Sequence, residues 1–222
     1  MDVPNRSELE RKLARRVGRE LRGEVNDIVD LLTETPSIND IPAGFWAERG
    51  SALSDILTPL LSEIFVFQVS AEAVDLGVEV DWQLINRRAA DWARNYTFEL
   101  VRELTDTSRT LLQDSIASYF ENEWTRGDLI DKLIADFGPV RAERIAVTEV
   151  TRAASAGEEG LREELERAGI HMDEFWHTNN DELVCEICGP LDMTRRGVDW
   201  NEPPPAHVNC RCFTGLEIIK NG

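Results

Sequence analysis

All four cysteines of this 222-residue chain lie between positions 185 and 212. They are spaced as Cys185-x2-Cys188 and, further along, His207-x2-Cys210-x-Cys212. Two cysteines three positions apart can both point at one ion from a tight turn, and zinc takes four sulfur or nitrogen ligands in a tetrahedron. The spacing therefore predicts a structural zinc site. Cys185 and Cys188 belong to any such site, and the sequence leaves open which of His207, Cys210 and Cys212 is left out.

Disulfide pairs and free thiols are the alternatives to a metal site. The N-terminal sequence MDVPNRSELERK has neither the apolar core nor the cleavage site of a signal peptide, so we expect a reducing compartment, which disfavours disulfides. The clustering of the cysteines disfavours four unrelated free thiols. Gly189 is expected to take a positive φ at the turn, and prolines 203–205 are expected to stiffen the approach to His207.

Helical periodicity dominates the chain up to Gly169. It predicts helices over about 9–32, 46–69, 81–120, 125–137 and 140–168, with Asp81 as an N-cap and a proline-rich loop over 34–44. After Gly169 the sequence predicts a hairpin, with strands at 175–178 and 183–184 around a turn at 179–180. The predicted fold is mainly α: an elongated helical bundle (1–124), then a small α+β module (125–222) whose metal-binding segment spans about 170–222.

The net charge of −18 disfavours extensive contact with nucleic acid or anionic lipid. Only residues 1–22 are basic, with seven basic and four acidic side chains, which is typical of a solvated helix face and alternatively of a patch that touches DNA. The longest apolar run, 56–69, is interrupted by Thr58, Pro59, Ser62 and Glu63, so we predict no membrane-spanning segment.

The sequence does not predict an enzyme, and no catalytic residue is assigned. Five candidate ligands are more than enough to close the tetrahedron, whereas a catalytic zinc keeps one position open for water. The chain has only three histidines, and no nucleophile-elbow, phosphate-loop or zinc-protease motif is present.

Three stretches resemble the Mu F-like phage head morphogenesis family: RAERIAVTEVTRAASAGEEG from Arg141, then FWHTNNDELVCEICGPLDM, then PPPAHVNCRCF. The shared features are a threonine–glutamate pair on a helix (Thr148 and Glu149), a tryptophan-led hairpin (Trp176), Cys-x2-Cys, and a terminal His-x-Asn-Cys-Arg-Cys. The resemblance covers about residues 125–219. It departs at Val147, where an arginine is common, and at Val208, where a proline is common.

The resemblance implies a minor head protein, present in few copies at the portal vertex of a virion or procapsid, and in the host cytoplasm during assembly. Its expected partners are the portal and other capsid proteins, with packaged DNA near the N-terminal helix, and its expected roles are in capsid assembly, DNA packaging or DNA delivery. We interpret Thr148 and Glu149 as structural, because a helical threonine often bonds back to its own backbone and Glu149 can pair with Arg144 or Arg152.

Two other functions remain as alternatives. An HNH-type nuclease would need more histidine and asparagine residues around the ion, and only His207 and Asn209 are available. A zinc-supported nucleic-acid-binding module should be basic around the knuckle, yet residues 170–222 carry four basic and nine acidic side chains.

Overall fold

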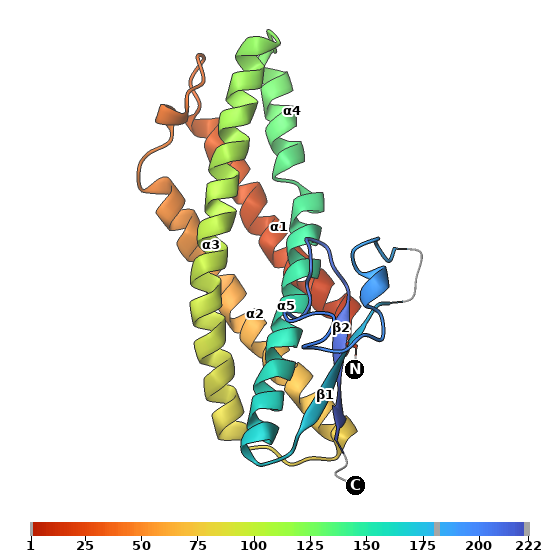
Figure 1. Ribbon diagram of the computed structural model, residues 1–222. Helices are drawn as coiled ribbons and strands as arrows, with labels where there is room; N and C mark the ends of the chain where they lie inside the picture. Colours follow the sequence, from red (N-terminus) through yellow and green to blue (C-terminus); the bar gives the residue numbers. More distant parts are fainter. Residues whose placement is uncertain (1, 180–182, 220–222) are drawn as a thin grey trace. The chain divides into compact units, whose positions relative to one another are not determined.

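The computed structural model describes residues 2–179 and 183–219. Within these ranges the chain forms five α-helices and two strands (Figure 1). The prediction of a mainly helical chain with a small C-terminal α+β segment is confirmed. The elements are α1 (Arg6–Leu31), α2 (Phe45–Leu76), α3 (Trp82–Glu121), α4 (Arg126–Asp136), α5 (Pro139–Arg167), β1 (Met172–His177) and β2 (Phe213–Ile218), with short 3-10 turns η1 (Ile38–Asp40) and η2 (Gly189–Leu191).

Several helix ends follow from single residues, of which Asp81 and Gly169 were expected from the sequence. Asp81 Oδ1 accepts the backbone N–H groups of Gln83 and Leu84 at 2.9 and 3.1 Å, which satisfies two otherwise unpaired donors at the start of α3. Thr125 caps α4 through a reciprocal hydrogen-bonded box with Asp128. Gly169, with φ of 82°, follows the end of α5 in a backbone region that disfavours other residues.

The chain divides into two compact units, each assembled from separate stretches of sequence. Unit 1 comprises Met1–Glu10, Pro59–Ala93 and Arg144–Gly222, and unit 2 comprises Arg11–Thr58 and Arg94–Glu143. The candidate metal ligands all lie in unit 1. The division into 1–124 and 125–222 that we predicted from the sequence stays a prediction.

Unit 2 is built from amphipathic helix segments whose apolar sides meet. At the C-terminal end of α1, the guanidinium of Arg126 donates to the carbonyls of Val29, Leu32 and Thr33 at 3.0–3.2 Å, which satisfies acceptors that the helix itself leaves unpaired. The buried apolar side chains of this unit include Leu13, Val17, Leu21, Val25, Ile28, Leu53, Leu57, Leu100, Leu112, Leu129, Leu133 and Phe137.

Unit 1 has a core in which α2 and α5 approach each other closely. A Cβ on Gly157 would lie 2.5 Å from the carbonyl oxygen of Phe65, and one on Gly160 would lie 2.7 Å from its ring. Only glycine leaves room for α2 at these two positions of α5. The core residues are Phe65, Val69, Ala73, Ile85, Ala89, Leu161, Leu165, Met172 and Leu216.

Helix α2 is longer than the range 46–69 that the sequence predicts. It continues through Pro59 and runs to Leu76, and by length and composition it could cross a membrane, with a mean hydropathy of 1.4 over its most apolar window. However, 44% of that window is buried within the structure, and core helices of soluble proteins pass the same test. The predicted absence of a membrane partner stays a prediction.

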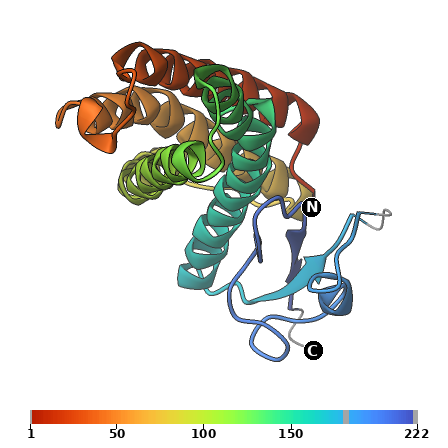
Figure 2. The ribbon, with the colours of Figure 1, turned by 90° about the horizontal axis from the view of Figure 1, so that it is seen from above.

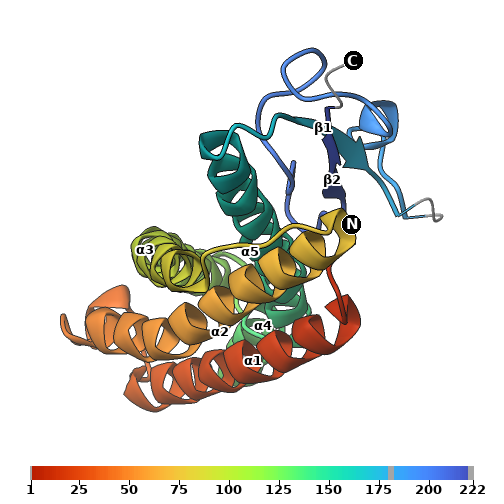
Figure 3. The same cartoon turned by 90° about the horizontal axis from the view of Figure 1, so that it is seen from below.

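The predicted hairpin after α5 is wrong in its partner strand. β1 pairs antiparallel with β2, with Trp176 opposite Thr214, and residues 183–184 are not in a strand. On its other edge β1 bonds to residues 193–196: Met193 donates to Trp176, and Trp176 donates to Thr194. Asn180 lies outside the described residues. Figures 2 and 3 show the two strands and their connecting loops gathered beside α5, within unit 1.

Candidate metal centre

The five predicted ligands reach one place from three loop segments. Cys185 and Cys188 lie on the turn that leads into η2, His207 and Cys210 lie on the loop after the prolines, and Cys212 directly precedes β2. Because β2 pairs with β1, the last of these ligands is anchored in the sheet. Cys188, Cys210 and Cys212 are buried.

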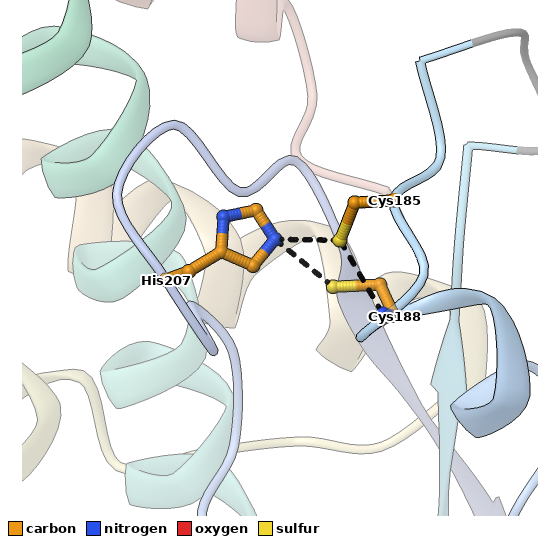
Figure 4. A group of neighbouring side chains, drawn as sticks. All are labelled: Cys185, Cys188 and His207. Atoms are coloured by element: carbon orange, nitrogen blue, oxygen red, sulfur yellow. Dashed lines mark hydrogen bonds between the residues drawn. The ribbon is translucent and has the colours of Figure 1, made fainter.

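The donor atoms form two groups that share Cys188. Cys185 Sγ and Cys188 Sγ lie 3.0 and 3.2 Å from His207 Nε2, and both sulfurs face the imidazole (Figure 4). On the other side, Cys188 Sγ lies 3.8 Å from Cys210 Sγ. In both groups, Cys185–Cys188–His207 and Cys188–Cys210–Cys212, all donor atoms lie within 4.8 Å of one another. These groups could bind a metal ion.

The distances can be compared with the edges of a zinc tetrahedron. Bond lengths of about 2.3 Å to sulfur and about 2.0 Å to nitrogen place two sulfurs about 3.8 Å apart, and a sulfur and a nitrogen about 3.5 Å apart. The Cys188–Cys210 separation of 3.8 Å equals the first value. The two sulfur–imidazole distances of 3.0 and 3.2 Å are shorter, so these ligands would move apart by about 0.3 to 0.5 Å around an ion.

A hydrogen bond orients the imidazole of His207 for metal binding. Its Nδ1 lies 2.8 Å from the carbonyl oxygen of Val208. A carbonyl can only accept, so Nδ1 carries the proton and the Nε2 lone pair faces the cysteine sulfurs. The same hydrogen bond raises the pKa of His207. Metal-binding histidines are commonly held by such a contact through their second nitrogen.

The turn at Cys185 and Cys188 has the hydrogen bonding of a metal knuckle. The backbone N–H of Cys188 donates to Cys185 Sγ at 3.4 Å, and Gly189 N–H donates to the carbonyl of Cys185 at 2.9 Å. We call the segment after α5, residues 170–179 and 183–219, the C-terminal lobe. The expectation of a positive φ at Gly189 is wrong, because in the C-terminal lobe the positive φ values are at Met193, Gly197 and Asn209. The φ of 66° at Asn209 turns its backbone N–H towards α5 instead.

Hydrogen bonds among the sulfurs and burial shift the pKa values of three cysteines in different directions. A hydrogen bond from the Cys212 thiol and others from the backbone lower the pKa of Cys210 to about 5, whereas burial and the charge of Cys210 raise the pKa of Cys188 to about 12. A hydrogen bond to Cys210 and burial also raise the pKa of Cys212. Such thiol–thiolate pairs are the arrangement in which a cation can take the place of protons.

Two tryptophans form the apolar support of the centre. The rings of Trp176 and Trp200 meet edge to face with centroids 5.4 Å apart, and Trp176 is 1% exposed. They pack with Cys188, Cys210 and Cys212 in one buried cluster. Trp200 also donates its indole N–H to the carbonyl of Thr194, which ties the cluster to the segment beside β1.

No family model, curated protein or solved structure matches the chain. The function of the candidate centre is therefore inferred from its own chemistry.

A pocket of about 170 Å³ opens at the donor atoms and is lined in part by Leu183, Val184 and Arg211.

Ion pairs hold the lobe to α5. Arg196 pairs with Glu159 and, at 2.7 Å, with Glu174, while Arg162 pairs with Glu159 at 2.7 Å. Although burial raises the pKa of Glu159, hydrogen bonds from the two arginines outweigh it and the pKa is lowered. Because these pairs are partly buried, they are screened less by salt than surface pairs are. Sequence reasoning missed this network, since its members are far apart in the chain.

The threonine–glutamate pair has the structural contacts that we expected. Thr148 Oγ1 donates to the carbonyl of Arg144 at 2.7 Å, and Glu149 lies 3.9 Å from Arg152. Thr148 Oγ1 also accepts the backbone N–H of Asn209 at 2.8 Å, which the sequence had not indicated. This contact joins α5 to the loop between His207 and Cys210.

Proposed function

We propose that the chain is a structural minor head protein of a tailed phage, of the Mu F-like kind, whose C-terminal lobe is held by a zinc ion. One observation carries the proposal: the separate stretches that resemble the family contact one another. Thr148 of α5 bonds to Asn209, and Trp176 packs with Cys188 and Cys210. Residues that meet in space from distant stretches are what a shared structural module requires.

Zinc is the metal that fits the donor groups best. Three or four thiolates with at most one imidazole form a soft ligand set, which favours zinc over magnesium or calcium. The two-stranded sheet of the lobe has too small an apolar core to hold its long loops without further support. A structural zinc contributes on the order of 10 kcal/mol to such segments.

We propose a structural role for the ion because the ligands available can close its coordination sphere. Of the other two histidines, His177 lies in β1 and stacks on Phe213 with centroids 5.2 Å apart, and His171 precedes β1. Neither belongs to the donor groups found among the described residues. This placement disfavours the HNH-type nuclease, and the acidic charge of the lobe disfavours the nucleic-acid-binding module.

The assembly role is tested in particles made by the phage or prophage genome that encodes the chain. We expect mass spectrometry of purified procapsids or virions to detect the chain in a few copies. We also expect a Cys185→Ser genome to yield fewer complete heads than a Glu34→Gln control, which changes an exposed residue outside the lobe. Absence of the chain from both kinds of particle would contradict the proposal.

Binding to DNA separates the proposal from its two alternatives. At low salt, steeply salt-dependent retention of DNA would support the nucleic-acid-binding module. Magnesium-dependent cutting would support the nuclease. We expect neither from the purified zinc-loaded protein.

A further inference from the structure

The loop that carries His207 and Cys210 is bonded to α5 at a second position, one helical turn after Thr148. Thr151 Oγ1 donates to the carbonyl oxygen of Cys210 at 2.8 Å, and Thr151 is 1% exposed. A hydroxyl has one proton to donate. Because Thr151 gives it to Cys210, the same oxygen can only accept from any further partner.

That further partner comes from the N-terminal segment. Arg6 Nη1 donates to Thr151 Oγ1 at 2.8 Å, and Arg6 is 7% exposed although it carries a charge. Arg6 also pairs with Asp2 at 2.8 Å and with Glu10 at 3.7 Å. Glu10 in turn lies 3.6 Å from Arg211, the residue between Cys210 and Cys212. Residues 2–10 therefore reach the loop of the candidate ligands directly, through Glu10 and Arg211, and indirectly, through Arg6 and Thr151 of α5, with all four residues within unit 1.

We propose that Thr151 and Arg6 are positioning residues for the metal-binding loop, and that metal binding and docking of residues 2–10 stabilise each other. The inference rests on the proposed metal centre and not on the role in phage assembly. Its basis is a series of two buried hydrogen bonds in which Arg6 donates to Thr151 and Thr151 donates to the carbonyl of Cys210.

Metal binding and docking of residues 2–10 are coupled because each end of this series of hydrogen bonds loses a partner when the other end moves. If the loop is not held by metal, Cys210 no longer offers its carbonyl in a fixed position, and the Thr151 hydroxyl is free to turn. The buried guanidinium of Arg6 then loses an oriented acceptor, which is costly for a charged group. By reciprocity, metal binding favours docking of residues 2–10 by the same factor by which that docking favours metal binding, and removing the Thr151 link should reduce this factor.

Hydrogen exchange on the full chain measures the first half of the proposal. The zinc-loaded protein is compared with protein treated with a chelator under reducing conditions, and metal content is measured on the same samples. We expect amides of residues 6–10 to exchange about tenfold faster without metal, since a hydrogen bond to a charged group is lost. Amides of α4, which lies in unit 2, should not change.

Thr151→Val tests the link itself, because it keeps the shape of the side chain and removes the hydroxyl. We expect it to bind one zinc about tenfold more weakly in competition with a chromogenic chelator, and to lose most of the metal-dependent protection of residues 6–10. Thr151→Ser should restore both. A merely structural role would lower the melting temperature without changing the difference between loaded and metal-free protein.

Thr107→Val is the matched control, since Thr107 bonds back to the carbonyl of Glu103 on an exposed part of α3 in unit 2. It should leave zinc affinity and N-terminal protection unchanged. If zinc binds and residues 6–10 exchange equally with and without it, the coupling is wrong and the metal centre stands. If no metal binds, the metal centre and the coupling are both wrong.

Discussion

Cys188 Sγ lies 3.8 Å from Cys210 Sγ, although the two residues are 22 positions apart. Cys188 is also the residue that the two groups of donor atoms share. Whichever four of the five candidates bind the ion, we expect Cys188 to be one of them.

Cys188→Ser should therefore abolish metal binding, whereas Cys212→Ser should leave it intact if Cys210 is the fourth ligand. The first variant loses a contribution on the order of 10 kcal/mol to the lobe, so its unfolding should no longer respond to a chelator. Elemental analysis and thermal unfolding, with and without chelator, measure both effects. One zinc per chain in Cys188→Ser would contradict the proposed centre.

Gly157→Ala should destabilise unit 1 by about 2 to 3 kcal/mol, because the added Cβ would lie 2.5 Å from the Phe65 carbonyl oxygen and must push α2 away from α5. The matched control is Gly23→Ala on α1, where the nearest atom to the new Cβ is 3.7 Å away. That variant should gain about 0.5 to 1 kcal/mol from helix propensity. Urea unfolding compares the two, and equal free energies of unfolding would show that the close approach is absent in solution.

Glu158→Gln should remove a loss of stability at alkaline pH. Burial raises the pKa of Glu158 well above 4.5, and the negative charge of Glu72 adds to the effect. A carboxyl whose pKa is raised by folding favours the folded state at low pH, and this stability is lost as the pH rises through the raised pKa.

Unfolding by urea from about pH 5 to about pH 9 should show this decline in the wild type and a flatter profile in Glu158→Gln. Glu34→Gln changes an exposed carboxyl and should keep the wild-type profile. Parallel profiles for the wild type and Glu158→Gln would contradict the assignment.

Trp176 should report on the metal through its fluorescence. It packs with Cys188, Cys210 and Trp200 at 1% exposure, so loosening of the loops on chelation admits water to the indole. We expect chelation to shift the emission to longer wavelength. Trp176→Phe should remove most of this shift, and Trp46→Phe, in unit 2, should keep it. An unchanged shift in Trp176→Phe would place the loosening elsewhere.

The helices and their ends could be predicted from the sequence, because they depend on residues that are close together in the chain. Each helix was recognised because its apolar residues recur with the helical period, and the ends at Asp81, Thr125 and Gly169 follow from capping and backbone preferences of single residues. For helix α2 the sequence predicts an end at 69, seven residues before Leu76, because the apolar run ends there and the polar Ser70, Glu72 and Asp75 follow without ending the helix.

The strand pairing could not be predicted in the same way. A hairpin between 175–178 and 183–184 is the nearest local solution, but β1 pairs with β2, whose Phe213 and Thr214 lie far along the chain. Pairing over that distance depends on the intervening loops being held, and their donor side chains are held by each other. The turn residues predicted at 179–180 do not indicate that the loops between β1 and β2 are held closed.

By itself, the sequence determined the helical class of the chain and the set of side chains that could bind a metal, because periodicity and the spacing of cysteines act over a few residues. Only the tertiary structure decided that Thr151 and Arg6 stand behind Cys210, that Gly157 admits α2, and that Cys188 joins both donor groups. These relations depend on which distant surfaces pack together, and that is set by the sum of many weak contacts rather than by any local pattern.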